Sequence, residues 1–271
     1  MDGLTEKQER DVKRYRPVEA EGVTLWPVRV KENTEFLFAR VSLEILQQSF
    51  PVRYLTMPIL EAFYRMDYDA VADGQKPTGA FSSAVLALLL ALRVGEGEEV
   101  KNRLKRCKVY TDAGDHAKLR LLSFEKDGET ISIKPAQFRA IREVIAAQNG
   151  VETYGDDANP DLVEAERAIA EEAASRLRGG IEEKIAFASA LLHVDEEDID
   201  EWPILRLERK TNAVRRAIDY AVCAVNEGAG VKWKGGNPVP HPYLERKRES
   251  AALQNLETAF GGEGAKAIHN A

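Results

Sequence analysis

The closest grouping of possible metal ligands in the sequence is one short stretch, Asp112-Ala113-Gly114-Asp115-His116. Two carboxylates and an imidazole this close together could meet at one metal ion. Aspartate and glycine are also the residues that a turn between two strands uses. A hard-metal site needs further oxygen ligands, which the sequence does not identify. We therefore interpret this stretch as a turn, and we predict neither a metal nor a cofactor.

The sequence also lacks the signatures of nucleophilic catalysis and of phosphate binding. Cys107 and Cys223 lie far apart, and neither has a CxxC partner or a histidine close by in the chain. No G-x-S-x-G motif occurs, and the glycines and lysines of Gly228–Gly236 do not form G-x-x-x-x-G-K-[ST]. We predict a protein that works by contact rather than by catalysis, with two free thiols in a reducing cytoplasm.

The composition sets the class of protein and its range of partners. Hydrophobic residues make up 44% of the chain and charged residues 31%, which is typical of a globular protein, and its abundant Ala, Leu, Glu and Arg favour helix. A net charge of −7 argues against a general polyanion binder. The most apolar run, Ala84–Leu92, is far shorter than the roughly 20 residues of a membrane span. No contact with a membrane is predicted.

Three basic stretches keep nucleic-acid binding open as an alternative. They are Lys101–Lys108, Arg206–Arg216 and Arg246–Arg248. Each has the spacing of a solvated helix face, and none interleaves aromatic residues as a binder of single strands would. Contact with nucleic acid is therefore the less favoured interpretation.

The positions of these residues depend on the fold, which we predict to be mainly α (α+β), with helical, bundle-like domains and a small antiparallel flap. Residues 1–22 are predicted to be a loose charged arm that is helical in part, and Val23–Val30 a short strand interrupted at Pro27. The first domain then spans residues 23–150. Its helices are indicated by apolar stripes from Phe36 to Phe50, from Ile59 to Met66 and from Phe81 to Leu92, and a short basic helix follows at Glu98–Lys105.

The middle of the chain, at about residues 107–133, predicts a β flap of short strands, with Asp127-Gly128 as a hairpin turn. A helix from Pro135 ends at Asn149-Gly150, and a turn-rich linker covers residues 151–160. A C-terminal helical domain follows over 161–238, before a polar tail at 239–271. Its last helix, from about Leu205 to Asn226, has one apolar stripe, formed by Val214, Ile218, Ala221, Val222 and Val225.

Acidic residues gather in segment 161–201, where 13 Asp or Glu stand against four Lys or Arg. Within it, Ile181–Trp202 has the outline of a helix-turn-helix, but its second helix is so acidic that it would repel phosphates. We interpret it as an acidic helical corner that can bind a basic protein partner. The predicted partner-binding residues are Glu182, Glu183, Asp195, Glu196, Glu197, Asp198, Asp200, Glu201 and Trp202.

An ordered set of short signatures across residues 23–240 resembles a poorly characterised family of tail-morphogenesis proteins from tailed phages and prophages of Gram-positive hosts. The most specific signature is Phe138–Gly150, which directly follows Ile131-Ser-Ile-Lys-Pro-Ala-Gln. The others are Val28–Phe36, Asn159–Glu166, Ile181–Trp202 and the Gly230-Val-Lys exit of the long helix. Segment 51–107 matches nothing in this pattern.

The resemblance implies a non-catalytic tail-assembly factor, similar to a chaperone that keeps the tape-measure helix from aggregating while the tail polymerises. Its expected partners are other phage proteins, such as the tape measure or tail subunits, and it could form a homo-oligomer. The expected location is the host cytoplasm. One alternative is a structural tail or baseplate protein that stays in the virion; another is a nucleic-acid-associated phage regulatory protein.

Overall fold

The computed structural model describes residues 3–153, 159–176, 180–233 and 238–239 of the chain. Two compact units can be distinguished. The first comprises Met1–Thr153 together with Lys184–Arg209, and the second comprises Tyr154–Glu183 and Lys210–Ala271. The described part is mainly helical and has two small antiparallel sheets, which confirms the predicted fold class.

The N-terminal segment of the first unit is structured, so the prediction of a loose arm over residues 1–22 is wrong. Helix α1 (Glu6–Lys13) begins with a capping box, in which Thr5 and Gln8 each bind the other's backbone N–H. Strands β1 (Val18–Ala20) and β2 (Val23–Leu25) then form an antiparallel pair. Two apolar residues, Val12 and Val18, hold the segment because they are buried in the core. The predicted strand over 23–30 ends early, at Leu25.

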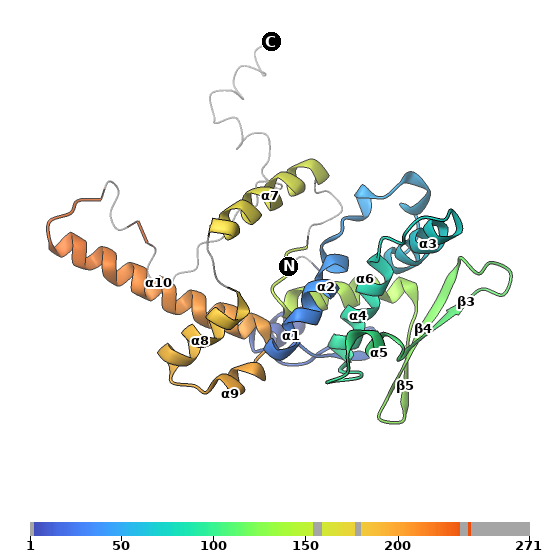
Figure 1. Ribbon diagram of the computed structural model, residues 1–271, viewed down its shortest axis with the longest axis horizontal. Helices are drawn as coiled ribbons and strands as arrows, with labels where there is room; N and C mark the ends of the chain where they lie inside the picture. Colours follow the sequence, from blue (N-terminus) through green and yellow to red (C-terminus); the bar gives the residue numbers. More distant parts are fainter. Residues whose placement is uncertain (1–2, 154–158, 177–179, 234–237, 240–271) are drawn as a thin grey trace, which may run out of the picture. The chain divides into compact units, whose positions relative to one another are not determined.

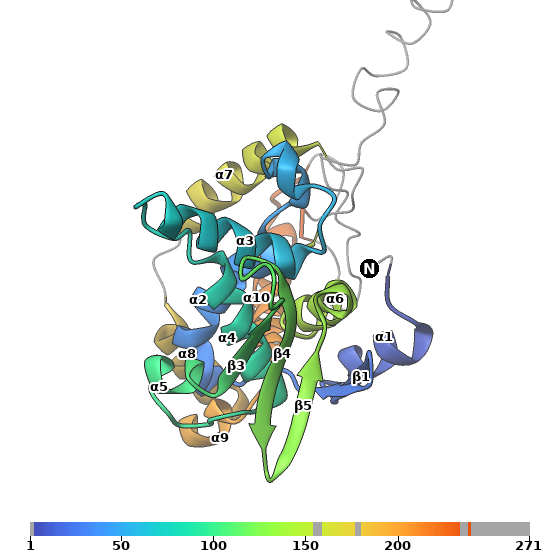
Figure 2. The same cartoon turned by 90° about the vertical axis from the view of Figure 1, so that its right-hand side faces the viewer.

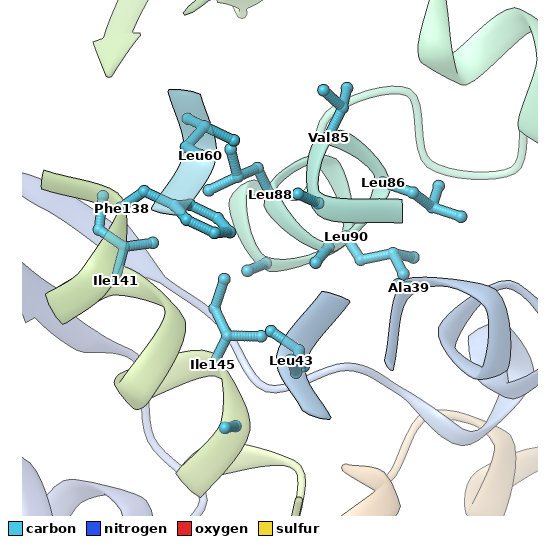
Figure 3. Close-up of a cluster of buried hydrophobic side chains, with 14 of the residues drawn as sticks. Ala39, Leu43, Leu60, Val85, Leu86, Leu88, Leu90, Phe138, Ile141 and Ile145 are labelled. Carbon is cyan, nitrogen blue, oxygen red and sulfur yellow. The ribbon is translucent and has the colours of Figure 1, made fainter. Parts of the chain in front are cut away.

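The core of the first unit is built from four helices (Figure 1), namely α2 (Asn33–Glu44), α3 (Ile59–Ala72), α4 (Ala80–Leu92) and α6 (Phe138–Gln148). Helix α4 is buried along nearly its whole length, as its apolar run Ala84–Leu92 predicts. Figure 3 shows its side chains Leu88 and Leu90 among Leu43 of α2, Leu60 of α3 and Ile145 of α6. The apolar stripes of four segments thus meet in one core.

Helix α2 ends six residues earlier than its apolar stripe predicts. Ile45 takes an extended conformation, and two short 3-10 turns, η2 (Gln47–Ser49) and η3 (Val52–Tyr54), carry the chain onward. Phe50 lies between these turns and still reaches the core, where its ring packs edge-on against Phe63 at 5.6 Å between centroids. The stripe contacts the core as predicted, but the prediction of one continuous helix is wrong.

A three-stranded antiparallel sheet lies against these helices (Figure 2). It consists of β3 (Cys107–Thr111), β4 (Leu119–Lys126) and β5 (Glu129–Ile133), with β4 in the centre. Asp127 and Gly128 join β4 to β5, and both have positive φ, as a tight hairpin requires. The sheet buries Leu122, Phe124 and Ile133. The predicted flap is confirmed.

Two further segments close the first unit around this core. Helix α5 (Val100–Leu104) precedes the sheet, and the 3-10 turn η4 (Pro135–Gln137) leads into α6. Gly150 ends α6 with a φ of +70°, and an added Cβ there would lie 2.9 Å from the side chain of Leu205. The backbone conformation therefore favours glycine at this position, and a larger residue would also make the Leu205 side chain move.

A buried ion pair lies inside the first unit. Arg103 is 1% exposed, and its Nη1 lies 3.0 Å from Oε1 of Glu32, which follows Lys31 in the 3-10 turn η1 (Val30–Glu32). Its Nε donates to the carbonyl of Val94 at 2.8 Å. The prediction that Lys101–Lys108 forms a solvated basic face is therefore wrong at Arg103, because this side chain is part of the core.

Residues 184–209 pack with the first unit, so the predicted C-terminal domain over 161–238 is not one body. The segment holds most of α8 (Ile181–Leu192), all of α9 (Glu196–Asp200) and the start of α10 (Ile204–Gly228). Backbone bonds fix it, with Val30 N–H donating to Trp202 at 2.8 Å and Ile204 N–H to Val28 at 2.9 Å. Periodicity along one segment could not predict these contacts between distant segments.

The second unit contains α7 (Pro160–Arg176) and the rest of α10, which Figure 1 shows as one long helix. The predicted linker at 151–160 lies partly, and the tail at 239–271 almost wholly, outside the described residues. Along α10 the predicted stripe is on the surface, since Ile218, Val222 and Val225 are 44%, 55% and 72% exposed. Among the helices that the structure describes, none is long and apolar enough to cross a membrane.

Candidate partner-binding surface

Most of the acidic residues predicted to bind a partner lie around a helical corner of the first unit. Helix α8 ends at His193, whose φ of +52° lets the chain turn, and Asp195 precedes α9. The backbone carbonyl of Asp195 accepts bonds from Asp198 and Ile199 in the first turn of α9. Ile199 is fully buried, so the opposite face of this short helix is directed outward. We call residues 187–198 the acidic corner.

Two of the predicted residues, Glu201 and Trp202, anchor the corner rather than extend from it. The Glu201 carboxylate is 3.0 Å from Arg29 Nη1 and also pairs with Lys31. The bond from Lys31 and the charge of Arg29 lower the pKa of Glu201. The Arg206 guanidinium stacks over the Trp202 ring at 4.2 Å. Both side chains therefore have structural partners within their own chain.

Four predicted carboxylates remain exposed, at Asp195, Glu196, Glu197 and Asp198. In the described part of the chain, none of them has an ion pair, and they follow one another directly in sequence. Acidic side chains are favourable in the first turn of a helix, so α9 tolerates three of them there. Asp200 is half-buried. The result is a concentrated negative surface at one end of the corner.

An apolar pair that the acidic pattern did not reveal lies on α8, just before these carboxylates. Phe187 and Leu191 are 37% and 44% exposed, one helical turn apart. Ile185 and Ala188 of the same helix are buried, which fixes the orientation of α8. The four-residue spacing of Phe187 and Leu191 was a visible signal in the sequence, but spacing alone does not distinguish a buried pair from an exposed one.

Glu182 and Glu183, the remaining predicted residues, belong to the second unit, which begins again at Lys210. Glu183 accepts a bond from the Gly180 backbone N–H at 2.7 Å, a capping interaction at the start of α8. Glu182 is exposed. The predicted set is thus divided, and the candidate surface consists of the acidic corner alone.

The stretch considered as a metal site is a turn, as the sequence analysis interpreted it. Asp112 accepts bonds from the Gly114 backbone N–H and from Arg120 at 2.7 Å, and both lower the pKa of Asp112. The Asp115 carboxylate binds the Ala117 N–H and Arg65, each at 3.0 Å. Within the described residues, no group of three or more His, Cys, Asp or Glu is placed to hold a metal ion.

Neither Cys107 nor the surface hollow on α3 and α4 adds a reactive group. Burial raises the pKa of the Cys107 thiol to about 12, so the thiol is protonated at neutral pH. The hollow has a volume of about 360 Å³ and is lined mainly by Tyr64, Tyr68, Val71, Ala72 and Phe81. Its one carboxylate, Asp67, already accepts backbone N–H bonds at the start of α4, from Thr78, Gly79 and Phe81. The hollow is thus lined mainly by apolar surface, and its carboxylate is already hydrogen-bonded.

Comparison with protein-family models, with curated proteins and with solved structures finds no match. The family resemblance therefore remains a prediction.

Proposed function

We propose that the protein is a non-catalytic assembly factor that binds other proteins through the acidic corner, in the manner of a phage tail-assembly chaperone. One observation carries the proposal. The corner presents four carboxylates without a described ion-pair partner next to an exposed apolar pair, on a frame fixed by Glu201 and Trp202. The matching partner is an amphipathic helix with a basic flank, of the kind that a tape-measure protein would expose.

The two parts of the surface have different physical roles. Phe187 and Leu191 can insert between the apolar side chains of a partner helix, and their burial supplies the favourable free energy of binding. The carboxylates attract a basic partner at long range and reject acidic ones, which gives rate and specificity more than affinity. A surface of this kind can hold an aggregation-prone helix reversibly.

The alternative of nucleic-acid binding finds less support. In the basic stretch Lys101–Lys108, Arg103 is buried, Arg106 pairs with Glu98 and Lys108 pairs with Glu125. Each of these cations is already neutralised by a carboxylate of the same chain or held inside it. A surface that binds phosphates needs cations that are available.

The proposal is tested by measuring the affinity of the full chain for a synthetic amphipathic helical peptide with a basic flank, using titration calorimetry. The Asp195→Lys/Glu196→Lys/Glu197→Lys variant is expected to bind roughly 10- to 100-fold more weakly, because attraction becomes repulsion. Its matched control is Glu6→Lys/Asp73→Lys/Glu129→Lys, which changes the net charge equally at exposed positions elsewhere in the first unit. The control is expected to bind like the natural chain.

Two results would contradict this function. Equal weakening in the charge-matched control would show that only net charge matters. Unchanged binding of Phe187→Ser/Leu191→Ser would show that the apolar pair takes no part. Mass spectrometry of purified virions then separates an assembly factor, which is expected to be absent, from a structural tail subunit, which would be present in stoichiometric amounts.

A further inference from the structure

The exposed stripe of α10 has the spacing of a coiled-coil seam. Val214, Ile218, Ala221 and Val225 follow one another at intervals of four, three and four residues. The same alternation runs back through Thr211 and Leu207, which are buried. When intervals of three and four residues alternate along a helix, the apolar side chains stay on the side that faces a second helix. The usual result is a left-handed coiled coil.

This seam is long and apolar, so burying it against a second helix would be favourable. The part of α10 in the second unit, from Lys210 to Gly228, is about 28 Å long at 1.5 Å per residue. Ile218, Val222 and Val225 lie 44%, 55% and 72% exposed along it. Ala217 and Ala224 flank the seam, and such small residues let a second backbone approach closely.

The charges along α10 indicate which helix fits. In the first half Lys210 and Arg215 directly flank the seam, whereas the acidic residues of the second half, Asp219 and Glu227, lie further round the helix. An antiparallel copy of the same helix places the basic half of each beside the acidic half of the other, and it opposes the two helix dipoles. A parallel copy would instead place Lys210 against Arg215 on both sides, which is unfavourable.

We propose that α10 is an antiparallel dimerisation helix, so that the stripe Val214, Ile218, Ala221, Val222 and Val225 is covered by the same stripe of a second copy. In this register Ile218 lies opposite the partner subunit's Ala221, and Val214 lies opposite the partner subunit's Val225. The two-fold relation makes both contacts occur twice, as in an isologous interface. The proposal does not depend on the partner of the acidic corner.

The first test is the mass of the full chain in sedimentation velocity, over concentrations of about 1 to 100 µM. The expected species at the upper end has twice the chain mass of 30.2 kDa. The Ile218→Glu variant is expected to weaken association by roughly 100-fold, because a carboxylate would be buried in the seam. Its matched control, Ala213→Glu, places the same charge at an exposed position on another face of α10 and should still dimerise.

A second test measures whether the two α10 helices of the dimer run parallel or antiparallel. In a Cys223→Ser background, Ala217→Cys protein is mixed with tagged Ala224→Cys protein and treated with a short bifunctional thiol reagent. The antiparallel register predicts crosslinks in the mixture that are absent from either variant alone. Both cysteine variants are expected to fold like the natural chain, because Ala217 and Ala224 are exposed.

A monomer throughout the concentration range would overturn the proposal, since it would mean that another segment or another protein covers the stripe. Dimers that survive Ile218→Glu as well as they survive Ala213→Glu would place the interface elsewhere and overturn it too. Crosslinks that form equally within each single variant would overturn the antiparallel register.

Discussion

Helices α4 and α10 show two opposite uses of apolar sequence. In α4 the residues from Ala84 to Leu92 are all apolar, and they are buried among α2, α3, α6 and the sheet. In α10 they form one stripe on a charged helix, and its C-terminal half is exposed. Apolar content therefore does not by itself mark the core. The residues around the stripe decide whether a helix completes its own unit or presents a surface to another chain.

The largest effect is expected where the packed unit buries charge. Replacing Arg103 with Leu removes the closer guanidinium partner of the buried Glu32 carboxylate and leaves it only Arg29, 3.6 Å away, so the free energy of unfolding should fall by about 3–5 kcal/mol. Urea denaturation followed by circular dichroism measures this loss. The double variant Arg103→Leu/Glu32→Leu should recover part of it, because neither charge of this pair is then left without the other and Arg29 keeps its pairs with Glu96 and Glu201. A loss below about 1 kcal/mol in the single variant would mean that water reaches Glu32.

Within α4 itself, Leu88→Ala should lower the free energy of unfolding by about 2–5 kcal/mol, because the side chain is fully buried and its removal leaves a cavity. The same urea denaturation applies. Leu88→Met keeps the volume and is expected to cost less than about 1.5 kcal/mol. Equal losses for both variants would argue that shape at this position, rather than the lost volume, limits stability.

The burial of α4 and the hairpin of the sheet could both be predicted from the sequence. An apolar run such as Phe81–Leu92 can only be stable when buried, and the Asp127-Gly128 hairpin depends on two adjacent residues, so both were predicted from local pattern. Segment 1–22 was predicted to be loose because its apolar residues are sparse, although two of them, Val12 and Val18, are buried in the core. The burial of Arg103 could not be predicted, since its partner Glu32 is distant in the chain.

The candidate surface was predicted only in part, for the same reason. The exposed carboxylates Asp195–Asp198 were identified from charge density, which depends on local sequence alone. Glu201 and Trp202 were placed in the same set, yet they bind Arg29, Lys31 and the backbone of Val30. Sequence shows which residues are acidic, but the fold decides which of them are already paired.

A smaller effect is expected at the anchor of the acidic corner, and it depends on pH. Because the folded state lowers the pKa of Glu201, its ion pairs stabilise the fold above the unfolded value of about 4.3 and stop doing so as pH falls through the folded pKa. Its side chain is 54% exposed, so the contribution is below about 1 kcal/mol. Urea denaturation at several pH values should show Glu201→Gln less stable than the natural chain at pH ~7, with the difference vanishing in acid.

The control for this measurement is Glu197→Gln, whose exposed carboxylate has no ion pair with a described residue. It should leave the stability at pH ~7 unchanged within about 0.5 kcal/mol. A pH-independent loss in Glu201→Gln would indicate that its bonds to Arg29 and Lys31 act through geometry rather than through charge.

The smallest effect is expected on the exposed stripe of α10, where Val225→Ala removes a side chain that is 72% exposed. At low protein concentration the free energy of unfolding should change by less than about 0.5 kcal/mol, because little apolar surface is buried there. At high concentration the natural chain gains stability from association and the variant gains less, so the difference should grow. Thermal unfolding at two concentrations measures both. A loss above about 1.5 kcal/mol in dilute solution would mean that Val225 is packed within the single chain, and the contrast between α10 and α4 would then disappear.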